Sequence, residues 1–129
     1  MARWWRCLAD YNGEAVAYEA AAGAGGASPF VPDKDARLIG LKLFGFSETA
    51  ASLKEGVLIR LTCALWSPNT MIVAHSGIGL ATVPVNPANP IDYPVEQPVK
   101  AGVPITIEGL NLVATAVTQR TLVMGLFEG

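Results

Sequence analysis

The chain has 129 residues, of which 51% are hydrophobic and 16% are charged, and its formal net charge is −2. This length predicts one domain with a buried core, and the composition excludes a disordered chain and argues against strong nucleic-acid binding. The charged share is below the usual level of roughly 25%. Either another protein covers part of the surface, or small residues such as Ala, Gly and Thr do.

Residues 1–35 are predicted to form an N-terminal arm and its linker. The arm, residues 1–22, begins with MARWWRC, and the linker, residues 23–35, begins with the Gly-rich GAGGAS that is typical of flexible connections. Aromatic and Arg side chains dominate protein contacts. The candidate partner-binding residues of the arm are therefore Arg3, Trp4, Trp5, Arg6 and Tyr11. The alternative is that RWWRCLADY is the first strand of the following domain.

Residues 36–129 are predicted to form an all-β domain. GVLIRLTCALW, for example, places Val57, Ile59 and Leu61 on one face and Arg60 on the other, which is the period of a strand. SETAASLKEG (47–56) is compatible with one helical turn. The predicted strands are 36–46, 57–66, 71–76, 78–84, 91–95, 103–108, 110–117 and 120–127.

The segment NPANPIDYPVEQP, residues 86–98, contains four prolines. Because proline cannot donate a ladder hydrogen bond, this segment is predicted to be a loop, a polyproline-like arm or an edge strand. It can hold at most a short strand at 91–95.

About eight short strands in one domain predict an antiparallel β-sandwich of the jelly-roll type, with two four-stranded sheets. An immunoglobulin-like sandwich is the main competitor, but Trp66 follows Cys63 too closely for the spacing of that fold. Two similar stretches, LKEGVLIRL (53–61) and VKAGVPITI (99–107), fit the jelly roll, because each reads as a turn followed by a strand in one Greek-key half.

The sequence carries no catalytic signature, so we expect no enzyme, no cofactor and no metal site. His75 is the only histidine, which is too few for a zinc or cupin-type site, and the adjacent Ser76 would point to the opposite face of a strand. Asp33 and Asp35 suit either a calcium ion or a solvated turn. Cys63 shares the parity of core residues, so a disulfide with Cys7 is not expected.

Aromatic side chains offer two further candidates. Trp66 and Tyr93 are predicted to lie at strand ends or in loops, where they would serve as interface or glycan contacts. Residues 61–91 lack charge, but the prolines within them exclude a transmembrane helix. Asp10 and Glu14 interrupt any secretory signal. We therefore expect a protein made in the cytoplasm of its host cell, without a membrane partner.

The order of the strands, the Pro-rich segment at 86–98 and the stretch PVKAGVPITIEG resemble small viral jelly-roll proteins. These include tailed-phage decoration (cement) proteins and single jelly-roll capsid proteins, and the resemblance covers residues 36–128. It implies a structural virion protein that forms homo-oligomers, with trimers favoured, and that binds the major capsid protein. The resemblance implies no catalytic residues. The arm lacks the strong positive charge of RNA-packaging shell proteins, which favours decoration of a capsid.

Three alternatives to a decoration protein are kept. One is a jelly-roll protein of the capsid shell itself. Another is a carbohydrate- or receptor-binding β-sandwich, which would use the exposed aromatic side chains. The last is a carbohydrate-active enzyme, which would need two carboxyl groups that face each other across a cleft. The sequence does not indicate which carboxyl groups would do so.

Overall fold

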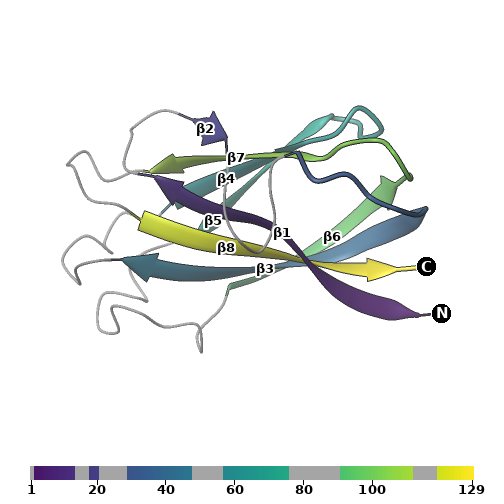
Figure 1. Cartoon of the computed structure of the whole chain (residues 1–129), viewed down its shortest axis with the longest axis horizontal. Coiled ribbons are helices and arrows are strands. Elements are labelled where there is room, and N and C mark those ends of the chain that lie inside the picture. Colours follow the sequence, from purple (N-terminus) through teal and green to yellow (C-terminus); the bar gives the residue numbers. More distant parts are fainter. Residues whose placement is uncertain (1, 14–17, 21–28, 48–56, 76–90, 112–118) are drawn as a thin grey trace.

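The computed structural model describes residues 2–13, 18–20, 29–47, 57–75, 91–111 and 119–129. This part of the chain is all-β and contains no helix, and it forms two antiparallel sheets packed as a β-sandwich (Figure 1). It therefore also holds no helical segment with the length and hydropathy of a membrane span. The elements are β1 (Arg3–Gly13), β2 (Glu19–Ala20), β3 (Ala36–Ser47), β4 (Val57–Thr62), β5 (Thr70–His75), β6 (Ile91–Val99), β7 (Thr106–Asn111) and β8 (Gln119–Glu128).

The first sheet has the strand order β1-β8-β3-β6, and the second has the order β2-β7-β4-β5. β1 pairs with β8, so residues near the two ends of the chain lie side by side at one end of the sandwich (Figure 1). Ala2 and Gly129 extend this pairing with reciprocal backbone hydrogen bonds of 3.3 and 3.0 Å.

The core lies between the two sheets and follows the strand period. In β4 the side chains alternate between buried and half-buried, with Val57, Ile59 and Leu61 inside, as the sequence predicted. Each fully buried aliphatic side chain of this kind contributes about 1.5–3 kcal/mol to folding. The largest fully buried side chains are Tyr11, Leu8, Leu38, Leu41, Leu43, Ile59, Leu61, Ile105, Ile107, Val57 and Val123.

The N-terminal segment belongs to the sandwich, so the arm prediction is wrong for residues 3–13. β1 pairs with β8 from Arg3 to Gly13, with a bulge between Cys7 and Ala9. Leu8, Ala9 and Tyr11 are at most 1% exposed, because the bulge and the strand period turn them toward the second sheet. The alternative, that RWWRCLADY is the first strand, is confirmed. The linker stretch GAGGAS lies outside the described residues.

The segment 63–69 after β4 is a turn, so the strand predicted at 57–66 ends early. Cys63 accepts a backbone hydrogen bond from Trp66 at 3.1 Å and donates one to Asn69 at 2.9 Å. These bonds replace the sheet ladder after Thr62. Cys63 is buried, as expected for a core residue, and no disulfide joins it to Cys7 in the described part of the chain.

The described part of the Pro-rich segment, from residue 91 onward, forms β6, an edge strand of the first sheet, which is one of the three predicted forms. It runs to Val99 instead of ending at residue 95, because prolines are tolerated at an edge, where one side of the strand needs no ladder partner. The strand predicted at 103–108 is shifted to β7. Three predictions lie wholly or largely outside the described residues, namely those for 47–56, 78–84 and 110–117.

The stretch VKAGVPITI is a turn followed by a strand, as predicted. Val103 donates a backbone hydrogen bond to Lys100 at 3.1 Å, and Gly102 has a φ of 82°, a conformation that favours glycine. The turn of its twin, at 53–56, lies outside the described residues.

Candidate functional site

Strand alternation in β1 separates the residues that the sequence grouped as one binding arm. Trp4 and Arg6 point to the inner side, where they meet the segment 29–35 and β8. Trp5 points to the outer side of the first sheet and is 46% exposed. The structure therefore divides the predicted site between two surfaces.

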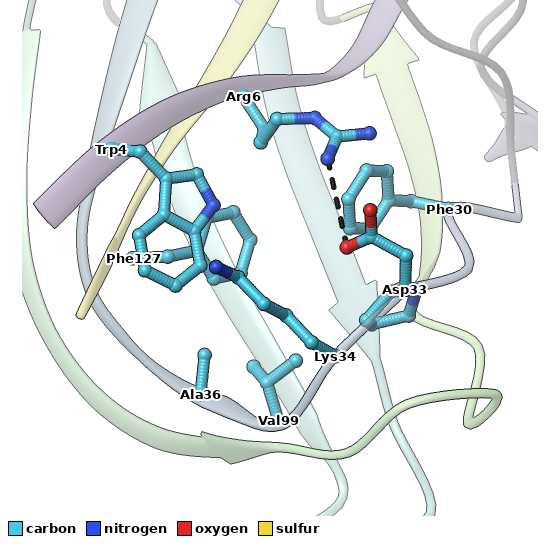
Figure 2. A pocket seen from close by; sticks show the side chains of 9 residues that line it. Trp4, Arg6, Phe30, Asp33, Lys34, Ala36, Val99 and Phe127 are labelled. Carbon is cyan, nitrogen blue, oxygen red and sulfur yellow. Dashed lines mark ion pairs between the residues drawn. The ribbon is translucent and has the colours of Figure 1, made fainter. Parts of the chain in front are cut away.

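On the inner side, aromatic rings and cations form a cluster at the end of the sandwich where β1 begins (Figure 2). Phe127 stacks between Trp4 and Phe30, with both pairs of ring centroids 6.0 Å apart. Lys34 Nζ lies 4.1 Å from the Trp4 ring centroid, and the Arg6 guanidinium carbon lies 5.4 Å from that of Phe30. Such cation–π contacts stabilise exposed sites by about 0.5–1 kcal/mol each. We call these five residues the aromatic cluster.

Backbone hydrogen bonds fasten the segment 29–35 over this cluster. Phe30 and Ile105 exchange two bonds of 2.8 Å, and Gly102 donates to Pro32 at 3.0 Å. Asp35 Oδ1 accepts a hydrogen bond from the Ala101 amide at 2.9 Å. The C-terminal part of the predicted flexible linker is thus docked on the protein.

The aromatic cluster encloses only about 10 Å³ of free space, which is roughly the room that one water molecule needs. Asp33 pairs with Arg6 at 3.8 Å and is otherwise exposed, so Asp33 and Asp35 do not converge on a cation. Among the residues that the structure describes, no group of three or more His, Cys, Asp or Glu side chains is placed to hold a metal ion. The geometry of the aromatic cluster is that of packing.

On the outer side, the first sheet carries a shallow apolar groove of about 370 Å³. We call it the outer groove. Lys42 Nζ lies 5.3 Å from the Trp5 ring centroid and 3.6 Å from Asp92 Oδ1. The residues that line the outer groove are Trp5, Lys42, Phe44, Leu122 and Met124.

Ion pairs within the chain match several of the described charges on the first sheet. Arg3 Nε donates to Glu128 Oε2 at 2.9 Å, and Arg37 pairs with Glu96. These pairs are largely exposed, so each contributes at most about 1 kcal/mol. Both pairs lie at the end of the first sheet where β1 begins, so charge is neutralised there.

The other predicted contact residues are mostly internal. Tyr11 is 1% exposed and packs against Gly109 of β7. Trp66 is 4% exposed, and its indole Nε1 donates to the Pro98 carbonyl at 2.9 Å. Tyr93 is half-buried against the core. These side chains hold the sandwich together and offer no exposed platform of the kind that glycan binding uses.

Sequence reasoning missed most of the outer groove, namely Phe44, Leu122 and Met124. The run TLVMGLF in β8 contained the signal, because it is apolar at successive positions and lacks the alternation of a strand with one solvated face. Phe30 and Lys34 were missed because a local reading assigned them to a linker.

Comparison with known proteins adds no relative. No protein-family model matches the chain, and none of the curated proteins matches it in sequence.

Proposed function

We propose that this protein is a structural, self-assembling virion protein with a jelly-roll fold, and that it acts as a decoration protein that binds the shell of a capsid. The observation that carries the proposal is the pairing scheme of the strands. β1 pairs with β8, β2 with β7, β3 with β6 and β4 with β5. A long antiparallel hairpin rolled into two sheets has this scheme, and it supports two Greek-key halves.

The link from fold to function is an analogy, because jelly rolls occur in viral coat proteins, lectins and cupins. Two features favour assembly among these classes. The outer groove presents Trp5 and a row of apolar side chains on one sheet face, as expected of a surface that other protein covers. Trp66, on which the glycan-binding alternative depends, is buried.

Residues 3–13 form a strand paired with β8, so they are not available as an arm that binds the capsid. Attachment to a shell would instead use the faces and edges of the folded sandwich. Trimers remain the expected oligomer from the resemblance to decoration proteins.

Self-association of the purified full chain tests this proposal. We expect light scattering after size exclusion, and sedimentation velocity, to give a discrete oligomer of defined mass at micromolar concentration. Electron microscopy of the same material distinguishes the two virion roles, because a shell protein closes into particles and a decoration protein stays in small oligomers. A strict monomer up to millimolar concentration would rule out self-assembly.

A further inference from the structure

β8 carries apolar side chains on both faces between Leu122 and Phe127, although it lies inside an open sheet, with β1 on one side and β3 on the other. In β8, Val123 and Phe127 point into the core, while Leu122, Met124 and Leu126 alternate with them on the outer face and are half-buried. β3 adds Phe44 next to Leu122 on that face. A strand with this composition is typical of a sheet that is covered on both sides.

The outer face of the second sheet is built differently. Arg60 of β4 donates two hydrogen bonds to Glu108 of β7, at 3.2 and 3.1 Å, and its guanidinium carbon lies 3.9 Å from the Tyr18 ring centroid. Thr62 and Thr70 are hydrogen-bonded at 3.3 Å beside them. This face has polar cross-strand pairs at its centre, which suits contact with water. The apolar outer groove is therefore a property of one sheet and not of the whole surface.

The charges on the first sheet indicate the chemistry of the occupant. Lys42, which lines the outer groove, is paired with Asp92 and lies near the Trp5 ring. Arg3 and Glu128 pair at the border. A nucleic acid or a highly charged peptide would need unmatched opposite charge, which the described residues of the outer groove do not offer, whereas an identical apolar face with paired charges needs none.

We propose that the outer groove is a two-fold interface, and that its occupant is the same face of a second copy of this chain. In such an isologous contact the two first sheets stack face to face, so that Trp5 and Met124 of each copy pack into the outer groove of the other. The flexible Met124 side chain adapts to the imperfect fit of two flat surfaces. The paired charges form the polar rim that surrounds the core of protein interfaces.

This inference rests on the proposed self-assembly and names the surface that performs it. It is compatible with a threefold oligomer, because two trimers joined through such contacts form a hexamer. The two symmetry elements would then use different surfaces of the same chain.

Sedimentation of full-length variants over a range of concentrations tests the interface. Met124→Lys would bury a charge in the contact between two copies, whereas in the monomer the lysine can reach solvent from the outer face. We therefore expect association to be at least 10-fold weaker and the circular dichroism spectrum to be unchanged. Ile72→Lys is the matched control, because Ile72 is 57% exposed on the outer face of the second sheet. It should associate like the wild-type chain.

A second pair of variants, with smaller changes, tests the interface if Met124→Lys fails to fold. Trp5→Ala removes an exposed ring, and Ile72→Ala is its control. Weakened association of Trp5→Ala alone supports the two-fold contact. Folded Trp5→Ala and Met124→Lys chains with wild-type association overturn it, while self-assembly itself still stands. A wild-type chain that stays monomeric overturns both proposals, and binding of an apolar dye in the outer groove would then indicate a different occupant.

Discussion

Gly109 of β7 lies directly against the ring of Tyr11 from β1. A Cβ atom at Gly109 would stand 2.2 Å from Cδ1 and 2.4 Å from Cε1 of that ring, far inside van der Waals contact. Tyr11 is 1% exposed, so its ring has no free space to move into. We expect Gly109→Ala to lower the free energy of unfolding by about 3 kcal/mol, the upper part of the range for overpacked cores, as measured by urea denaturation.

A double-mutant cycle separates this clash from a general cost of alanine in the strand. In a Tyr11→Leu background the ring is absent, so Gly109→Ala should cost much less than it does in the wild-type chain. If Gly109→Ala lowered the free energy of unfolding equally in the two backgrounds, the Tyr11 ring would not be the cause of the loss. The pair matters beyond one contact because it joins the first sheet to the second.

At the scale of elements, the turn before β7 depends on the backbone of Gly102. Its φ of 82° is unfavourable for side chains with a Cβ, yet a Cβ there would meet no other atom within 4 Å. A substitution therefore changes conformational energy without a clash. We expect Gly102→Ala to lower the free energy of unfolding by about 1 kcal/mol, and Gly102→Asn to cost less, because Asn tolerates this region better.

Thermal or urea denaturation of the two variants measures this difference. Gly102→Val provides the steeper end of the series, since branching at Cβ adds to the strain. If alanine and asparagine proved equally harmless, the positive φ would not be a constraint on the turn. The result bears on the repeated Lys-x-Gly pattern, whose second copy the structure describes as a true turn.

Local pattern was enough to predict most of the strands but not their place in the sheets. The period of two in GVLIRLT and the prolines of β6 are signals that neighbouring residues carry. The first predicted β4 correctly, and the second included an edge strand among its three forms but made β6 too short. β1 was misjudged because its partner, β8, lies at the opposite end of the sequence. The bulge between Cys7 and Ala9 also breaks the alternation of β1, so its strand period is hard to recognise.

The candidate site was predictable only in part, for the same reason. Trp5 was singled out by residue type, and it does line the outer groove. Its companions Phe44 and Met124 come from two other strands, and only the register of the sheet brings them together. Trp66 was misjudged because its exposure depends on β6, to which its indole is hydrogen-bonded.

For the whole molecule, the pairing of β1 with β8 makes the start of the chain a part of the folding unit. Leu8 and Tyr11 are fully buried, and β8 would have an open edge without β1. Loss of a large buried side chain typically costs about 2–5 kcal/mol, and a domain has only about 5–15 kcal/mol in total. We therefore expect a chain that lacks residues 1–13 to lose its cooperative thermal transition.

Circular dichroism melts and proton–nitrogen NMR spectra of the truncated chain measure this loss. Arg3→Gln is a suitable control, because it removes only an ion pair whose Arg3 side chain is 63% exposed, and it should melt like the wild-type chain. A truncated chain with dispersed NMR signals and wild-type association would restore the arm interpretation. A collapsed or insoluble chain would instead show that the strand which carries Trp5 to the outer groove is also needed to close the core.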